Sequence, residues 1–315
     1  MKSTGRGAMS CGVIVALLVL SAALFPQIAS ENPDPSREFV DDYGRRVYIP
    51  DTPERIISLF PSTTEILFAL GLGDKVVGVS DYCDYPPEVE EKDRVCGYST
   101  PNVEEIILLE PDIIFIGGIV GREPVDLLEG IGLRVFALKE ADSIGMIFSH
   151  IGIIGEITGA GEEARALVAG MASEIEEVRK SVMEKDRIKV AIIIWYQRDP
   201  TSLWVVGGNT YQNEMIEIAG GDNVFSDVDG YKSYQTCEKL IINNPDVIIV
   251  YQGHGSAIDT VRIITADSTL RGMKAIKTRS VFGVNEDLLA RDGPRIVDGI
   301  RSLYDCIAES RQVLT

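Results

Sequence analysis

Histidine is scarce in this chain, which has only His150 and His254 among its 315 residues. Resident zinc and similar transition-metal sites are usually built from three or four histidine or cysteine side chains. No CxxC spacing occurs either. We therefore expect neither a structural zinc site nor direct binding of free zinc or manganese ions.

Catalytic motifs are also missing. The sequence has no G-x-S-x-G elbow, no G-x-G-x-x-G after a strand, no Walker A motif and no H-E-x-x-H. An enzyme and a cell-surface structural protein are both disfavoured. The chain is expected to need no cofactor of its own.

The chain also has few positively charged residues relative to negatively charged ones. The 30 lysines and arginines face 48 aspartates and glutamates, for a net charge of -18. Such a surface repels nucleic-acid phosphates and anionic lipid head groups. The composition disfavours nucleic-acid binding and favours a basic protein partner.

Charge is also absent from a stretch near the N-terminus. Lys2 and Arg6 precede an uncharged run from Cys11 to Ala29. This pattern is typical of an export signal in residues 1–30, either a cleaved signal peptide or an uncleaved membrane anchor. Cys11 stands at the beginning of this run and not after it, so it is poorly placed for lipid attachment. The expected location is periplasmic or at the cell surface.

Four cysteines follow the leader, which is few for an oxidising compartment. Cys83 and Cys96 flank one loop, where they either form a disulfide or remain separate buried thiols. The sequence leaves both alternatives open. Cys237 and Cys306 have no obvious partner.

Short apolar runs of strand length alternate with helical stretches along the rest of the chain, after a hairpin expected within residues 39–50. Such alternation predicts an α/β fold with two parallel-sheet lobes, since a chain of this length exceeds one hydrophobic core. The expected boundaries are 31–158 for the first lobe, 159–186 for a linker helix and 187–315 for the second lobe. The expected strands are 55–59, 76–80, 112–116, 134–138, 189–195, 203–206, 246–251 and 280–284. The expected helices are 63–70, 103–109, 124–129, 211–219 and 294–308, the first with Ser62 or Thr63 as its N-cap.

The linker is the most regular helix that the sequence predicts. Apolar residues recur every three or four positions at Leu167, Met171, Ile175, Val178 and Val182, and charged residues occupy the opposite face. We expect this helix to join the lobes and to permit only modest closure between them.

Several segments resemble one known family. They are RIISLFPSTTEILFALGLGDKVVGVSDYCDYPPE (55–88), GYSTPNVEEIILLEPDIIF (97–115), WVVGGNTYQNEMIEIAGGDNVF (204–225), YKSYQTCEKLIINNPDVIIV (231–250) and ARDGPRIVDGI (290–300). In this order they resemble the helical-backbone solute-binding proteins of ABC importers for cobalamin and iron chelates. The resemblance covers the chain from about residue 39 to its end.

The resemblance implies that a small metal chelate is captured between the lobes and delivered to a permease dimer by a monomeric receptor. The SDYCDYPPE stretch is closer to the cobalamin branch, so cobalamin or a related corrinoid is the first expectation. A ferric siderophore or haem is the alternative.

Parallel sheets place ligand loops at the carboxyl ends of their strands, and seven of the eleven tyrosines fall in or beside such loops. Flat aromatic walls suit a corrin ring. The expected ligand contacts are Phe60, Pro61, Ser62, Tyr82, Tyr98, Trp195, Tyr196, Tyr231, Tyr234, His254, Asp287 and Arg291.

Individual residues in this set have competing interpretations. Anionic siderophores need clustered arginines, for which Arg291 is the best candidate, and Arg291 could instead pair with Asp287. By the resemblance, Tyr98 stands where cobalamin-binding relatives place a tryptophan against the ligand, and related haem carriers have a tyrosine iron ligand near this position. His254 either binds the metal of an incoming chelate or is an ordinary loop histidine, whereas His150 is expected in the core.

The resemblance also implies docking through one glutamate on each lobe. The matching residues are Glu104 and Glu238, each on the helix before a P-D-[IV]-I strand. Their equivalent positions would suit arginines on the two permease subunits. Glu105 could replace Glu104 by a shift of one residue, and both could be ordinary solvated glutamates.

Overall fold

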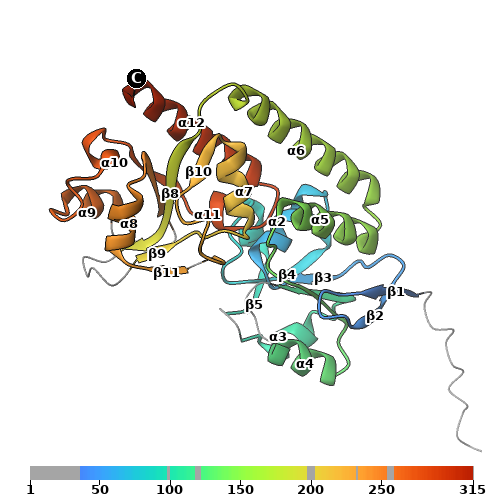
Figure 1. Cartoon of the computed structure of the whole chain (residues 1–315). Helices are drawn as coiled ribbons and strands as arrows, with labels where there is room; N and C mark the ends of the chain where they lie inside the picture. Colours follow the sequence, from blue (N-terminus) through green and yellow to red (C-terminus); the bar gives the residue numbers. More distant parts are fainter. Residues whose placement is uncertain are drawn as a thin grey trace, which may run out of the picture. The chain divides into compact units, whose positions relative to one another are not determined.

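The computed structural model describes residues 36–97, 100–117, 122–196, 203–231, 233–253 and 259–314. It contains two large β-sheets covered by helices, as the sequence predicts (Figure 1). A two-stranded sheet of β1 (Ser36–Val40) and β2 (Arg46–Pro50) precedes them. The precise lobe boundaries given above stay a prediction.

The first sheet is fully parallel, with the order β5-β4-β3-β6-β7. Its central strands are buried throughout, which explains their nearly continuous apolar sequence. The five strands are β3 (Ile56–Ser58), β4 (Val76–Ser80), β5 (Asp93–Cys96), β6 (Ile113–Gly117) and β7 (Val135–Leu138).

Helices cover both faces of this sheet. Along β6, Ile113 and Phe115 belong to a different apolar cluster from Ile114 and Ile116, because successive strand residues face opposite ways. Side chains of α2 (Pro61–Ala69) and α5 (Ile144–Thr158) join the first cluster, and those of α3 (Val103–Leu108) and α4 (Arg122–Gly130) join the second. Short 3-10 helices are η1 (Gly73–Lys75) and η2 (Pro87–Glu91).

The second sheet has the order β11-β9-β8-β12-β13, with β10 also paired to β8. Strands β8, β10, β12 and β13 are parallel, but β9 is antiparallel to β8, and β11 to β9. The predicted parallel sheet is present in those four strands, and the antiparallel edge formed by β9 and β11 was not predicted. Only residues 197–202 separate β8 from β9, which is too short for a parallel crossover. The strands are β8 (Ile188–Tyr196), β9 (Leu203–Val205), β10 (Gly221–Asn223), β11 (Ser233–Gln235), β12 (Val247–Gln252) and β13 (Val281–Asn285).

Helix α6 (Gly161–Val182) confirms the predicted linker helix. Its buried residues include Met171, Ile175, Val178 and Val182, and it packs against α5 of the first lobe and α7 and α12 of the second. One large apolar cluster consequently runs from the first sheet through these helices to the second sheet. The remaining helices are α7 (Tyr211–Ile218), α8 (Cys237–Asn243), α9 (Thr260–Ala266), α10 (Lys274–Lys277), α11 (Asp287–Ala290) and α12 (Ile296–Leu314).

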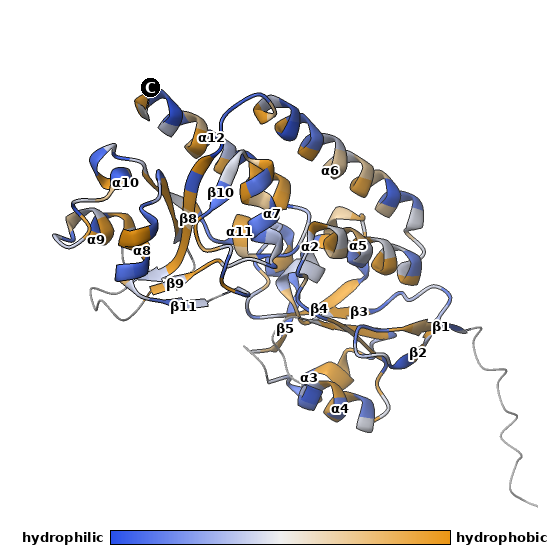
Figure 2. Ribbon diagram, in the orientation of Figure 1, coloured by the Kyte–Doolittle hydropathy of each residue, from blue (hydrophilic) through white to orange (hydrophobic). Residues whose placement is uncertain are grey.

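The hydropathy pattern follows this packing, with apolar residues on the covered faces of the helices (Figure 2). Within the described ranges, no helix is both long enough and apolar enough to span a membrane. The N-terminal segment 1–30 lies outside those ranges, so the choice between signal peptide and anchor stays open.

In the described part of the chain, Cys83, Cys96, Cys237 and Cys306 form no disulfide. Cys83 is buried and lies 3.1 Å from the hydroxyls of both Thr64 and Ser80. Burial raises the pKa of the Cys83 thiol, and it raises that of Cys96 to about 11. Cys83 and Cys96 are therefore separate buried thiols in the structure and not a disulfide.

Candidate functional site

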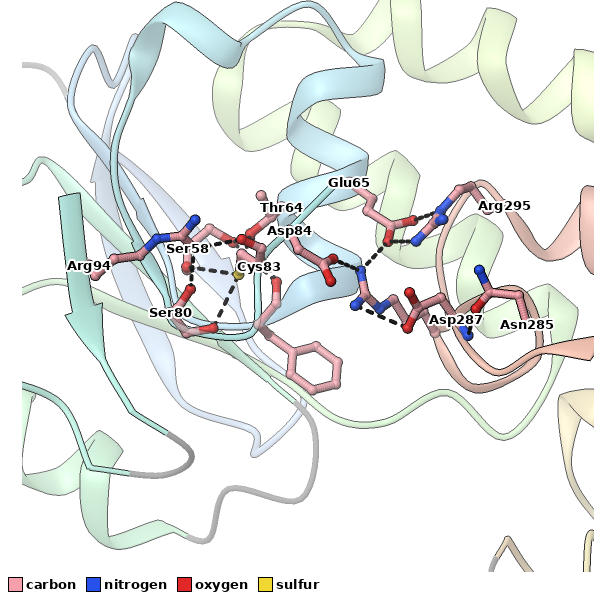
Figure 3. Close-up of polar contacts among 12 residues, drawn as sticks. Ser58, Thr64, Glu65, Ser80, Cys83, Asp84, Arg94, Asn285, Asp287 and Arg295 are labelled. Carbon is pink, nitrogen blue, oxygen red and sulfur yellow. Dashed lines mark hydrogen bonds and ion pairs between the residues drawn. The ribbon is translucent and has the colours of Figure 1, made fainter. Parts of the chain in front are cut away.

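A buried carboxylate joins the two lobes. Glu65 on α2 has a side chain that is only 2% exposed, and its Oε1 accepts a hydrogen bond from Nη1 of Arg291 at 3.0 Å. Arg295 donates to the same carboxylate from Nε at 2.9 Å and from Nη2 at 2.6 Å (Figure 3). Both arginines belong to the second lobe, so Glu65 neutralises charge across the junction.

Arg291 contacts two further carboxylates. Its guanidinium lies 2.7 Å from Asp84 of the first lobe and 3.0 Å from Asp287, so the alternative of an Arg291–Asp287 pair is present in the structure. Burial by itself would lower the pKa of Arg291, but hydrogen bonds to Asp84 and Glu65 outweigh it and raise the pKa. A role for Arg291 or Asp287 as a ligand contact stays a prediction, and it would have to compete with these ion pairs.

Two more side chains of the second lobe hold backbone groups of the first. Asp292 accepts a hydrogen bond from the backbone N–H of Ala141 at 2.8 Å. Glu214 on α7 accepts one from the N–H of Ile144 at 3.2 Å, and burial raises the pKa of Glu214. The junction is therefore fixed at several separate points.

A hollow of about 640 Å³ opens beside this junction. Its lining includes Glu65 and Tyr85 of the first lobe and Arg295 of the second. The Arg295 guanidinium lies 3.9 Å from the centre of the Tyr85 ring, a cation–π contact. Tyr82 and Tyr85 are each 42% exposed, so both retain accessible ring surface.

Three exposed aromatic residues form a row across the edge of the second sheet. Trp195 on β8 pairs with Trp204 on β9, and Trp204 pairs with Tyr234 on β11. The two indole rings lie 5.8 Å apart. The side chains are 38%, 38% and 57% exposed. We call Trp195, Trp204 and Tyr234 the aromatic row.

The sequence predicted two of these three residues as ligand contacts and missed Trp204. Trp204 occupies the middle of an apolar strand, where a core position is the usual expectation. Its position becomes clear only from the strand register, which places it directly between Trp195 and Tyr234.

Tyr196 was predicted beside Trp195 as a ligand contact, but the two side chains go to opposite faces. A register shift between Ile193 and Trp195 directs Tyr196 into the apolar cluster behind the sheet. Tyr196 is 4% exposed and its hydroxyl donates to Asp267 at 2.6 Å. Its burial and hydrogen bond mark it as a core residue, so we leave it out of the proposed contacts.

The loop after β3 differs slightly from the expectation. Helix α2 begins at Pro61 with Phe60 as its N-cap, not with Ser62 or Thr63. Proline is well suited to the first helical position, since its missing N–H needs no partner there. Phe60 and Pro61 are half-buried and Ser62 is buried, which leaves little of Ser62 for a ligand.

The other predicted contacts have varied positions. Tyr231 is half-buried and packs against the large apolar cluster. Tyr98 and His254 lie outside the described residues. His150 is buried on α5, with Nε2 2.9 Å from Asp42, as expected for a core histidine.

The two predicted docking residues occupy matching sites. Glu104 is exposed on α3, two residues after the N-cap Asn102, whose side chain accepts the N–H of Glu105. Glu238 is exposed on α8, two residues after the N-cap Thr236, whose side chain accepts the N–H of Lys239. Their docking role itself stays a prediction.

Comparison with known proteins shows what this architecture is similar to. The chain is 32% identical to an uncharacterized ABC transporter substrate-binding lipoprotein, YvrC of Bacillus subtilis (strain 168), over 85% of this chain and 84% of that one. It is 30% identical to a cobalamin-binding protein of Halobacterium salinarum (strain ATCC 29341 / DSM 671 / R1), over 93% and 82% of the two chains. Among solved structures, a possible iron-binding (periplasmic solute-binding) protein of Staphylococcus epidermidis ATCC 12228 matches with a TM-score of 0.71 and 30% identity, covering 81% of this chain and 99% of that one.

Residues 56–288 match the periplasmic binding protein family as a continuous region. The matched region extends from β3 in the first sheet to α11, so it includes both sheets, the linker helix and Glu65. Arg291 and Arg295, the partners of Glu65, lie just beyond its end. The chain belongs to the periplasmic binding protein family that serves ABC importers.

Proposed function

We propose that this protein captures cobalamin or a related corrinoid outside the cytoplasm and delivers it to the permease of an ABC importer. The observation that carries the choice of ligand is the aromatic row. Three adjacent exposed rings offer rigid apolar contact surface, with the two indole planes inclined at 52° to each other, and such rings bind ligands at a small cost in side-chain entropy. Tyr82 and Tyr85 supply further exposed rings on the other lobe.

The arginines favour a chelate without a large negative charge. Arg291 and Arg295 are already engaged by Glu65, and Arg291 also by Asp84 and Asp287. An anionic catecholate or carboxylate chelate would have to displace these carboxylates. The similarity to the cobalamin-binding protein of Halobacterium salinarum also supports a corrinoid.

A ferric siderophore or haem is the second candidate. It is favoured by the similarity to the Staphylococcus epidermidis protein, which is described as possibly iron-binding. Tyr98 would then be the residue to test as an iron ligand, since tyrosine oxygen is an established axial ligand of haem.

The location and partner follow from the same family membership. Members of this family are solute-binding transport proteins, and the relatives above are described as a lipoprotein and as periplasmic. We therefore propose a monomer in the extracytoplasmic space that binds one chelate and docks on a permease dimer through Glu104 and Glu238. No catalytic role is assigned.

Binding of a panel of chelates tests this function directly. Isothermal titration calorimetry with cyanocobalamin is expected to show binding of one molecule per chain, and native mass spectrometry of protein purified from its own source should show the bound corrinoid. Tight binding of a ferric siderophore without cyanocobalamin binding would shift the assignment to the second candidate. A Soret band in the purified protein would shift it to haem.

A further inference from the structure

Helices α3 and α8 carry the same pattern of exposed apolar residues. In each helix the proposed docking glutamate is followed, three and four positions later, by two large apolar side chains. In α3 they are Ile107 and Leu108, 51% and 74% exposed. In α8 they are Ile241 and Ile242, 40% and 80% exposed. We call these two sets the apolar pairs.

The apolar pairs do not result from a failure of the helices to pack. Each helix buries one apolar residue completely, Ile106 in α3 and Leu240 in α8, at the position two residues after the glutamate. These residues lie in the apolar clusters of the first and second lobes. The following two side chains then project away from the core, next to the glutamate on the helix surface.

The surroundings of the pairs also match. The chain leaves each helix through a left-handed residue, Glu110 with φ 43° or Asn244 with φ 42°. A Pro-Asp step follows each helix. The side chain of Asp112 accepts a hydrogen bond from the backbone N–H of Arg55 near the start of β3, and that of Asp246 accepts one from the backbone N–H of Lys189 near the start of β8. Both hydrogen bonds are 2.9 Å long. The two helices therefore present the same arrangement on the two lobes.

A partner for these surfaces must itself present one surface twice. Exposed isoleucine and leucine side chains next to a carboxylate favour apolar groups bordered by a basic group. The net charge of -18 disfavours both an anionic membrane surface and a second copy of this chain. A dimeric membrane protein with one apolar site beside a basic group on each subunit presents the same surface twice and complements the exposed apolar side chains and carboxylates. It is also neither an anionic membrane surface nor a second copy of this chain.

We infer that the apolar pairs Ile107–Leu108 and Ile241–Ile242 are the apolar part of the docking contact with the permease dimer, beside Glu104 and Glu238. This inference rests on the proposed function, because it takes the importer permease as the partner. The glutamates act mainly on the rate of encounter, whereas close apolar contact acts mainly on the rate of dissociation.

Double substitutions separate these contributions. The full chain is measured by surface plasmon resonance against the permease of its source organism in nanodiscs. The test variants are Leu108→Ser/Ile242→Ser and, as an independent second pair, Ile107→Ser/Ile241→Ser. The control is Met183→Ser/Val313→Ser, which removes apolar side chains that are 72% and 58% exposed elsewhere on the surface. Cyanocobalamin affinity is measured for every variant to show that the fold is intact.

Each test variant is expected to raise the Kd for the permease about tenfold, mainly through faster dissociation, with cyanocobalamin affinity unchanged. The effect should persist in 0.5 M NaCl, where the contribution of the glutamates is screened. The control should bind like the wild type. Test variants within twofold of wild type would overturn the inference while leaving the proposed function in place. A wild-type protein that binds cyanocobalamin but not the permease would overturn the proposed delivery function.

Discussion

Arg291 and Glu65 form a buried ion pair between residues 226 positions apart in sequence. Their side chains are 8% and 2% exposed, and their closest atoms lie 3.0 Å apart. Since Arg295 and Asp84 take part in the same network, each charge of the pair has a second partner of opposite sign. The junction of the lobes thus depends on ionic contacts that are shielded from solvent.

Glu65→Gln should strongly destabilise the protein. The substitution removes the negative charge that Arg291 and Arg295 share, and breaking a buried pair typically costs about 3–5 kcal/mol. Denaturant unfolding followed by circular dichroism measures the loss. Arg122→Gln is the matched control, because its pair with Asp126 is exposed and contributes about 0–1 kcal/mol. Equal effects of the two substitutions would contradict a special role for the buried network.

Intrinsic fluorescence should report ligand binding at the aromatic row. The two tryptophans of the chain are Trp195 and Trp204, and both belong to the row. A corrinoid bound nearby would quench their emission, and Trp204→Ala should weaken cyanocobalamin binding by about 1–3 kcal/mol. Calorimetry and fluorescence titration provide the measurements. Unchanged affinity of Trp204→Ala would remove the aromatic row from the binding site.

Tyr98→Ala should also weaken cyanocobalamin binding by about 1–3 kcal/mol, as expected for loss of a stacking aromatic. Tyr48→Ala serves as the control, since Tyr48 is 55% exposed on β2 and has no predicted contact with ligand. Calorimetry distinguishes the two substitutions. If both variants bind like the wild type, Tyr98 is not a ligand contact.

Charge reversal at the docking glutamates should separate transport from capture. Glu104→Arg/Glu238→Arg is expected to abolish uptake in vesicles that contain the permease, because two arginines would face basic groups of the partner. Cyanocobalamin affinity should remain unchanged, since neither residue belongs to the proposed ligand contacts. Normal uptake, or loss of ligand binding together with uptake, would refute the docking assignment.

Asp42 should contribute stability that depends on pH. Burial opposes its ionisation, but hydrogen bonds from His150 and the backbone of Lys139 outweigh this and lower its pKa below the ordinary 3.8. A lowered folded-state pKa means that the ionised group stabilises the fold above the unfolded value, and that this stability is lost as the pH falls through the folded value.

Asp42→Asn should therefore lower the free energy of unfolding at pH 6 and have a smaller effect near pH 2.5. Urea unfolding at both pH values checks the difference between variant and wild type. Asp126→Asn, in an exposed ion pair, is the control. If Asp42→Asn lowers the free energy of unfolding by the same amount at both pH values, the proposed pH dependence of the Asp42 contribution is ruled out.

The sequence was most informative where one local signal decided the structure. The apolar run at 76–80 and the periodic residues from Leu167 to Val182 form the predicted strand and linker helix. The positions of Glu104 and Glu238 were also found, because the helix and the following Pro-Asp step repeat in the sequence. Such features depend on neighbours only a few residues away.

Features that depend on long-range pairing were not predictable in the same way. Glu65 is the single charged residue of helix α2, and its arginine partners lie more than 200 positions away. The burial of Tyr196 follows from a register shift that no local pattern announces. The antiparallel edge of the second sheet is different, because the short connection between the expected strands 189–195 and 203–206 already excludes a parallel crossover.

The packing of α6 against both lobes has a consequence for the thermodynamics of capture. Wide opening of the lobes would separate Glu65 from two arginines and split a continuous apolar cluster. We therefore expect this joined arrangement to dominate before ligand arrives, so that little affinity is lost to conformational selection when ligand binds to it. The occupied and empty receptors then differ little in shape, so a permease would have to distinguish them by the ligand itself and by contacts at the rim of the lobes.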